Sequence, residues 1–199
     1  MSRRSQRERS SSTRAALVRA ARGLFAERGY PNVAAGEIVA AAGLTRGALY
    51  HHFTGKQGLF RAVFEELEGE VTAEIAAATA AAPDRPTGML LGLGRFLDVC
   101  QRPEVVQIAL TDAPAVLGWQ TWRQIEAEHG LGVVTDTLQA AQAEGLLQPM
   151  PVPVLGQLVL SAMIEAALLI AHAADRQAAR AQAEQALLGL LSGLLRQPP

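Results

Sequence analysis

Apolar side chains recur at helical spacing along nearly the whole chain, and glycine and proline separate the stretches that carry them. In the first stretch, Leu17, Ala21 and Phe25 fall on one face of a helix. Gly29 and Pro31 then interrupt the pattern. The chain is rich in Ala and Leu, which favour helix, and no segment alternates as a strand does. We therefore predict an all-α protein of about nine helices.

The same periodicity and its breaks predict where the helices lie. The expected elements are a first helix capped at Ser12 or Thr13, a short second helix over 35–42, a third from Arg46 to His52, a long fourth from Gly55 to the Pro83 break, a fifth capped by Thr87, a sixth from Pro103 to Asp112, a seventh from Trp119 to Glu144, an eighth from Pro153, and a ninth after Asp175.

Charge is distributed unevenly along the sequence. The whole chain has a net charge of −1, but residues 1–60 contain ten Lys or Arg and three acids, giving +7, and the remainder carries −8. A basic N-terminal part on an acidic body is typical of a DNA-binding head. A solvated basic tail is the alternative. Residues 1–12 are polar, Ser-rich and basic, so we expect a disordered arm there.

Several classes of protein are disfavoured by composition. Cys100 is the only cysteine, so no intrachain disulfide is possible and a reducing, cytoplasmic location is expected. The charged N-terminus does not resemble a signal peptide. The most apolar stretch, residues 155–171, contains Glu165 and is short for a membrane span, so no membrane partner is expected. No nucleophile motif, paired ligand set or phosphate-binding loop indicates an enzyme or a cofactor.

The most specific segment covers residues 35–53, which read AGEIVAAAGLTRGALYHHF. This pattern predicts a helix, a tight turn at Gly43 and a second helix capped by Thr45. Leu44 and Leu49 are expected to face inward. The outward face of the second helix then carries small and polar residues and can enter the major groove of DNA.

The stretch from Thr13 to Val63 resembles the DNA-binding domain of the TetR family of bacterial transcriptional regulators. The resemblance rests on Gly43-Leu-Thr-Arg-Gly-Ala-Leu-Tyr-His-His-Phe53, followed by Lys56 and Leu59. It implies a helix-turn-helix domain over residues 13–56 and a helical effector-binding and dimerisation domain over 57–199. Weaker similarity continues through residues 112–119 and the helices that follow.

The resemblance also implies roles for single residues. Thr45, Tyr50 and Lys56 would hold phosphates, and Arg46 and His51 would face bases or nearby phosphates. Gly47 and Ala48 would allow close approach, with His52 beside them in a more structural role. Tyr50 could instead pack in the core. The family usually has Ser or Thr where Ala34 and Ala35 stand here, which weakens the expected phosphate contacts of the second helix; Arg3, Arg4, Arg7 and Arg9 are expected to compensate along the DNA.

The resemblance further implies a homodimer and a small-molecule effector, which we expect to be apolar. Candidate pocket residues are Phe96, Cys100, Ile108, Asp112, Trp119, Trp122, Glu165 and His172. Candidate interface residues are Leu158, Ala162, Leu169, Leu187, Gly189, Leu190, Gly193 and Leu194, in which the glycines would let partner helices approach closely. Alternatively, these stripes belong to the core of one subunit, and the pocket residues to packing or caps.

Glu126-Ala-Glu-His129 is a possible metal-ligand pair on a helix, but no second Glu-x-x-His occurs, and His51 and His52 point apart. We therefore expect no metal site. The prediction is a ligand-responsive repressor that binds a near-palindromic operator in double-stranded DNA as a dimer. A constitutive DNA-binding protein with a filled core is the main alternative, and an all-helical enzyme is a remote one.

Overall fold

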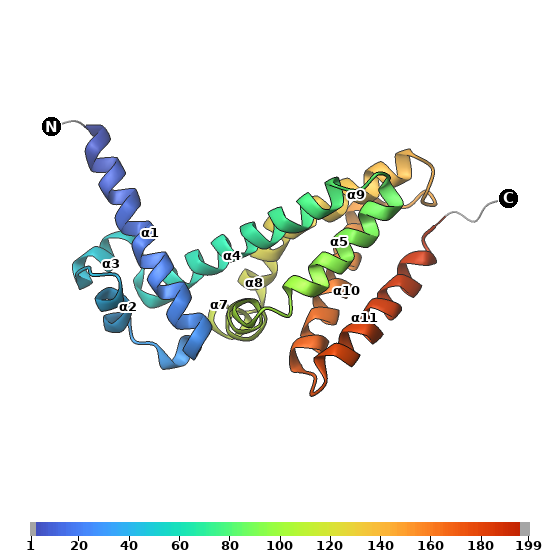
Figure 1. Ribbon diagram of the computed structural model, residues 1–199. Coiled ribbons are helices and arrows are strands. Elements are labelled where there is room, and N and C mark those ends of the chain that lie inside the picture. Colours follow the sequence, from blue (N-terminus) through green and yellow to red (C-terminus); the bar gives the residue numbers. More distant parts are fainter. Residues whose placement is uncertain (1–2, 196–199) are drawn as a thin grey trace. The chain divides into compact units, whose positions relative to one another are not determined.

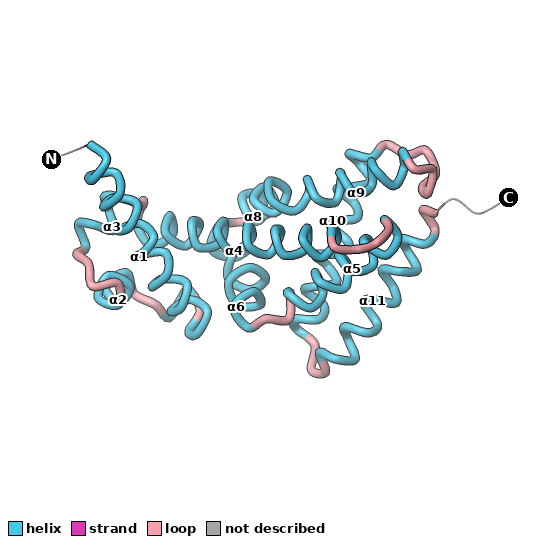
Figure 2. Tube along the Cα trace, turned by 45° about the horizontal axis from the view of Figure 1, so that its top comes forward, coloured by secondary structure: helices cyan, strands magenta, loops and turns pink. Residues whose placement is uncertain are grey.

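The structure, a computed structural model, describes the backbone of residues 3–195 and the side chains of residues 8–195. Within that range the protein is all-α, as predicted: the only β-type pairing there is an isolated bridge between Leu147 and Leu195 (Figures 1 and 2). The elements are α1 (Arg3–Arg28), η1 (Tyr30–Asn32), α2 (Ala35–Ala41), α3 (Arg46–His52), α4 (Gly55–Ala80), α5 (Arg85–Val99), α6 (Pro103–Val105), η2 (Val106–Asp112), α7 (Ala113–Leu117), α8 (Trp119–Glu126), η3 (Ala127–Leu131), α9 (Gly132–Ala143), α10 (Val152–His172) and α11 (Arg176–Ser192).

The first helix is longer than the sequence pattern indicated. We expected residues 1–12 to be a disordered arm, but α1 already begins at Arg3. The segment contains Arg, Gln and Glu, which are good helix formers, and no Gly or Pro. Extending a helix that is already nucleated costs little, so the polar segment joins the apolar one. The expected DNA contacts of Arg3, Arg4 and Arg7 lie outside the described side chains.

The chain folds as two compact units. Unit 1 comprises residues 1–67 and 103–122, and unit 2 comprises residues 68–102 and 123–199. The boundary at residue 56 stays a prediction; by contacts, the division falls inside α4, after Leu67, and residues 103–122 belong to the N-terminal unit. Periodicity along the chain could not indicate this, because the contacts that define the units join residues far apart in sequence.

The core of unit 1 is built from α1 and the first half of α4. Leu17, Phe25 and Phe60 are fully buried, and the Phe25 and Phe60 rings meet edge to face with centroids 5.3 Å apart. The returning segment is bound to α1 by the ion pair of Arg22 with Glu104, at 3.0 Å. This packing fixes the surface against which α2 and α3 lie.

Unit 2 is a bundle in which α10 packs against α9 and α11 (Figure 1). One of its apolar clusters contains Leu138, Ala141, Leu147 and Val152, all buried. By length and composition α10 could cross a membrane. It is longer than the apolar stretch, residues 155–171, that was judged short for a membrane span. Its buried face and its packing on two neighbouring helices are those of a core helix.

Two helices contain π-helical turns that the sequence did not predict. The sixth helix was expected to end near Asp112, but η2 leads directly into α7, with Pro114 in the first turn of α7. Proline has no N–H to donate, and a wider π turn accommodates the missing bond. The predicted long helix from Trp119 to Glu144 is also present, with η3 inserted after Glu126. The fifth helix starts earlier than expected because Asp84, not Thr87, is its cap.

Candidate DNA-binding interface

The turn between α2 and α3 has the predicted geometry. Gly43 has a φ of 65°, a left-handed conformation that favours glycine, and the Leu44 N–H donates to the Val39 carbonyl at 3.0 Å. The Thr45 hydroxyl accepts a hydrogen bond from the Ala48 N–H at 3.3 Å, so Thr45 caps α3. Leu49 is buried as expected, whereas Leu44 is only half-buried. The two helices are therefore held at a fixed angle by local bonds and one buried leucine.

The outer face of α3 is open to solvent. Tyr50 is 65% exposed, so core packing is not its role here. Arg46, Gly47 and His51 are also exposed, and Ala48 is half-buried. This face presents a guanidinium, a phenol and an imidazole beside residues with little or no side chain, which is the composition a helix needs to approach base edges closely.

His52 lies toward the inner side of α3. It is half-buried, and its ring lies 5.0 Å from that of His51 and 6.3 Å from that of Phe53, measured between centroids. These contacts agree with a structural role. Among the described residues no group of three or more potential metal-ligating side chains is assembled, so the two histidines have no third ligand beside them.

Gly36 on α2 is coupled to Arg46 on α3. A side-chain carbon built on Gly36 would lie 3.3 Å from the Arg46 guanidinium, which means that the arginine lies across the glycine. The two residues border a hollow of about 200 Å³, lined by Ala34, Ala35, Gly36, Val39, Arg46, Leu49 and Tyr50. Alanine in place of Ser or Thr at positions 34 and 35 thus removes a hydroxyl, and Gly36 beside them makes room for the Arg46 guanidinium.

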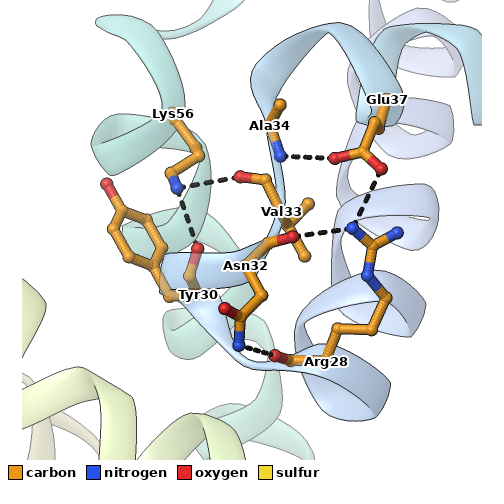
Figure 3. Close-up of polar contacts among 7 residues, drawn as sticks. All are labelled: Arg28, Tyr30, Asn32, Val33, Ala34, Glu37 and Lys56. Atoms are coloured by element: carbon orange, nitrogen blue, oxygen red, sulfur yellow. Dashed lines mark hydrogen bonds and ion pairs between the residues drawn. The ribbon is translucent and has the colours of Figure 1, made fainter.

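The start of α2 is capped from the opposite direction (Figure 3). Ala34 has no side-chain acceptor, but the Ala34 N–H donates to the Glu37 carboxylate at 2.7 Å. Arg28 donates to the same carboxylate at 2.9 Å and to the Asn32 carbonyl at 2.6 Å. The backbone hydrogen bond from Ala34, followed by the bond from Arg28, lowers the pKa of Glu37. Glu37 therefore supplies the half of a capping box that binds the N-cap N–H, and the hydroxyl half is absent at Ala34.

Lys56 is half-buried and hydrogen-bonded to two carbonyls of unit 1 (Figure 3). Its ammonium donates to the carbonyls of Tyr30, at 2.8 Å, and Val33, at 2.9 Å, and lies 3.8 Å from the centroid of the Tyr30 ring. Burial lowers the pKa of Lys56, and the nearby Asp112 opposes that effect. Two of its three N–H donors are thus used by the fold. One N–H donor remains, so the expected phosphate contact of Lys56 stays a prediction.

The pocket candidates in unit 1 have different surroundings. Asp112 is buried and accepts a hydrogen bond from the Tyr30 N–H at 2.7 Å, so its carboxylate serves the fold and not a pocket. Ile108 is core. Trp119 is 63% exposed, which contradicts a pocket wall. Trp122 is fully buried, and its indole N–H has no hydrogen-bond partner among the described residues.

Unit 2 contains an apolar slot that the sequence analysis missed. Its cavity volume is about 80 Å³, and its lining is Ile75, Thr79, Met89, Gly92, Leu93, Val133, Val134, Thr137, Leu138, Val159, Met163 and Leu191. None of the predicted pocket residues lines it. Phe96 and Cys100 are buried in the same unit, whereas Glu165 and His172 are exposed and are not pocket walls. Gly92 is the residue that could have indicated the slot from the sequence, because a side-chain carbon there would collide with Thr79.

A second apolar groove lies on the surface of unit 2, between α10 and α11. Its volume is about 250 Å³, and its lining is Leu158, Val159, Ala162, Met163, Leu187, Leu190, Leu191 and Leu194. Leu158, Leu169 and Leu190 are each more than 60% exposed, and their place in a dimer interface stays a prediction. Leu187 is buried and belongs to the core of the subunit.

The predicted glycine pair is not a feature of one helix. α11 ends at Ser192, and Gly193 is its C-cap, so only Gly189 lies within the helix. Both positions face open space, apart from a backbone contact of Gly193 with Leu190. The sequence spacing did not reveal this because the end of the helix is set by the chain that follows it.

Two family models match the chain. The model for bacterial regulatory proteins of the tetR family matches residues 17–63, and the model for the tetracyclin repressor-like C-terminal domain matches residues 86–194. The first covers α2, the turn and α3, and the second covers most of unit 2.

Curated proteins and solved structures are similar to the chain. The HTH-type transcriptional regulator CymR of Pseudomonas putida is 41% identical over 70 residues, which are 35% of this chain and 34% of that protein. The TetC protein of transposon Tn10 from Escherichia coli is 31% identical over 132 residues, 65% of each chain. The chain thus spans less than two thirds of the length of these relatives. A crystal structure of a TetR-family transcriptional regulator from Pectobacterium atrosepticum is 33% identical, with a TM-score of 0.86 and complete coverage of both chains.

Proposed function

The chain belongs to the TetR family of bacterial transcriptional regulators, and we propose that it is a ligand-responsive repressor that binds a near-palindromic operator as a homodimer. Members of this family are DNA-binding regulators and not enzymes. In this proposal a small molecule bound by the C-terminal domain releases the protein from DNA. A cytoplasmic location follows from that role.

The exposed face of α3 is the observation that carries the proposal. Arg46 and His51 contact base edges or adjacent phosphates, Thr45 and Tyr50 hold phosphates, and Gly47 gives close access. The exposure of Tyr50 and the small size of its neighbours support this assignment. The charge of +7 on residues 1–60 supports a large phosphate-binding contribution to affinity.

A second copy of the chain is the proposed occupant of the groove between α10 and α11. Leu158 and Leu190 border this groove and are largely exposed in a single subunit, and a symmetric partner would bury them in a four-helix arrangement. The dimer would place two α3 helices in successive major grooves, roughly 34–36 Å apart.

The slot in unit 2 supports a ligand-responsive protein over a constitutive DNA-binding protein with a filled core. α4 is one uninterrupted helix that begins next to the DNA-binding segment and carries Ile75 and Thr79 of the slot. A ligand that shifts this helix would couple effector and DNA binding, typically by ~1–3 kcal/mol.

Fluorescence anisotropy with DNA from upstream of the chain's own gene tests the proposal. The wild type should bind specifically, with affinity falling steeply as salt is raised. Arg46→Ala should lose about 1–3 kcal/mol of discrimination between operator and random DNA. Arg176→Ala, which changes an exposed arginine of unit 2, is the matched control and should bind as the wild type does. Absence of specific binding by the wild type at low salt would contradict the repressor proposal.

Sedimentation of Leu190→Glu tests the dimer. A charge in a symmetric groove appears twice, so this variant should be monomeric and bind the operator weakly. Leu90→Glu changes another exposed leucine, 54% exposed on α5 and outside the groove, and should remain dimeric. A dimeric Leu190→Glu variant would show that the subunits meet elsewhere.

A further inference from the structure

One arginine of the DNA-binding interface lies against a glycine of the neighbouring helix. A side-chain carbon built on Gly36 of α2 would lie 3.3 Å from Nη2 of Arg46 and 3.9 Å from its Nε. The guanidinium of Arg46, on α3, therefore occupies the space that a side chain at position 36 would need. Gly36 itself is half-buried, although the helix that carries it lies at the surface of unit 1.

The Arg46 guanidinium keeps its hydrogen-bonding capacity. Arg46 is exposed and makes no hydrogen bond or ion pair with any described residue. Arg28, at the end of α1, is by contrast bonded to Glu37 and to the Asn32 carbonyl. The N–H donors of an arginine form a planar fork that can bind two acceptors at once. In Arg46 this fork lies beside the glycine, and its donors are available to DNA.

The surroundings allow the guanidinium to move. A hollow of about 200 Å³ lies next to it, with walls that include Ala35 of α2 and Tyr50 of α3. Tyr50 is 65% exposed and follows Arg46 by one turn on the same face of α3. A carbon added at position 36 would thus meet the end of a flexible, exposed side chain, and no backbone atom. Such a carbon should displace Arg46 and leave the fold intact.

Guanine is the base that an arginine fork fits. Its O6 and N7 atoms accept two N–H bonds in the major groove, which is the commonest specific contact of this kind. A binding group has to be held within about 0.5 Å of its productive geometry. One carbon at position 36 would shift the guanidinium by a few tenths of an ångström, and a branched side chain would leave it no room there. Base reading by Arg46 therefore depends on the residue at position 36.

We propose that Gly36 determines operator specificity through Arg46: it leaves room beside α2 for the guanidinium, which reads one guanine in each half-site from that place. Gly36 is a positioning residue, and Arg46 is the residue that contacts the base. This inference rests on the proposed operator binding by α3, and it adds the base that is recognised and the residue of α2 that controls recognition.

Binding to every single-base-pair variant of one half-site tests the inference. The DNA is the upstream fragment that the wild type binds, and the measurement is fluorescence anisotropy with the full-length protein. Replacing the guanine read by Arg46 should weaken wild-type binding about tenfold. Arg46→Ala should abolish the preference at that base pair alone. Gly36→Val should abolish the same preference, and Gly36→Ala should reduce it.

Two results of this scan would overturn the inference. One is a preference for the guanine that stays unchanged in a folded Gly36→Val variant. The other is a loss of preference at several base pairs at once, which would mean that residue 36 sets the orientation of the whole of α3. Should Gly36→Val fail to fold, the smaller change Gly36→Ala decides the question, and an unchanged preference in that variant would also overturn the inference.

The double variant Gly36→Val/Arg46→Ala separates positioning from a direct clash with DNA. Each single variant should lower operator affinity about tenfold. If Gly36 acts through Arg46, the double variant should also lose only about tenfold, because both changes remove the same contact. An additive loss of about a hundredfold would mean that the side chain at position 36 meets the DNA itself, and would overturn the inference.

Gly23→Val is the matched control. Gly23 is another helix glycine of unit 1, on α1, and a side-chain carbon there has open space. This variant should keep the wild-type preference at every base pair. Thermal melting checks the fold: Gly36→Ala should melt no lower than the wild type, because alanine favours helix and Arg46 can move away. A Gly36→Ala variant that unfolds would overturn the inference, since the glycine would then serve the fold.

The wild type and Arg46→Ala separate this inference from the proposed function. If the wild type binds no DNA specifically, the repressor proposal fails and the inference fails with it. If the wild type binds specifically and Arg46→Ala loses the guanine preference while Gly36→Val keeps it, only the inference fails and the repressor proposal stands.

Discussion

Lys56 in unit 1 and Glu68 in unit 2 are both half-buried charged groups, but their surroundings differ. In unit 1, Lys56 is bonded to two carbonyls and Asp112 to a backbone N–H, while Glu37 at the surface joins Ala34 and Arg28. In unit 2, Glu68 has no such partner among the described residues, and an apolar slot is left in the packing.

This difference corresponds to two physical requirements. A helix that reads DNA must be held in one orientation, and charged groups with several short bonds provide that rigidity. A domain that responds to a ligand must leave some interactions unmade until the ligand arrives. Variants that remove a bond from unit 1 should therefore destabilise the protein, and a variant that removes the unmatched charge from unit 2 should stabilise it.

The largest effect is expected for Lys56→Met. It deletes both hydrogen bonds to the Tyr30 and Val33 carbonyls and the contact with the Tyr30 ring. The free energy of unfolding, measured in urea, should fall by about 3 kcal/mol. Arg61→Met, which removes only an exposed ion pair with Glu65 on the same helix, should cost under about 0.5 kcal/mol. Equal losses in the two variants would show that the Lys56 bonds do not stabilise unit 1.

Glu68→Gln should change how stability depends on pH. The pKa of Glu68 is raised from 4.5 to about 7 in the folded protein. Between these two pH values the native state holds a proton that the unfolded state has lost, so the free energy of unfolding declines as pH rises from 4.5 to about 7. The variant lacks this decline. It should be more stable than the wild type by on the order of 2 kcal/mol at about pH 8, with the difference vanishing near about pH 4. Urea midpoints of both proteins at these pH values measure it, and a difference independent of pH would contradict the shift.

A pair of glycine variants should show opposite effects in the two units. Gly92→Ala places a carbon against the Thr79 hydroxyl, which is bonded to the Ile75 carbonyl, so about 1 kcal/mol of stability should be lost. Gly47→Ala has only the Thr45 hydroxyl nearby, at 3.8 Å, and should keep or gain stability. Operator affinity should fall for Gly47→Ala and stay unchanged for Gly92→Ala. Thermal unfolding with anisotropy measures both, and a stable Gly92→Ala variant would mean that the slot is loosely packed.

The smallest effect is expected for Glu37→Gln. The amide keeps an oxygen for the Ala34 N–H but loses the charge that faces Arg28. Since the folded pKa of Glu37 is lowered, its stabilising contribution is present above the unfolded pKa of 4.5 and is lost as pH falls below it. The melting temperatures of variant and wild type should therefore differ slightly at neutral pH and converge in acid. A difference in melting temperature that did not change with pH would mean that the shape of the side chain, and not its charge, causes the effect.

Local signals predicted the DNA-binding segment well. The bounds of α3, the cap at Thr45 and the turn at Gly43 were all inferred from neighbours in sequence. The hydrogen bonds of Lys56 were not, because its partners Tyr30 and Val33 lie 26 and 23 residues away in the chain. For the same reason none of the predicted pocket residues lines the slot, whose walls come from five helices.

The helical class, the helix-turn-helix and the basic head could be predicted from the residues, because periodicity, capping and charge act over a few positions. The pairing of charged groups could not, because it depends on how distant segments pack. Asp112 meets Tyr30 across 82 residues of chain, and Arg22 meets Glu104 across the same separation. Burial and electrostatic coupling depend on distances through space, and no spacing along the chain encodes them.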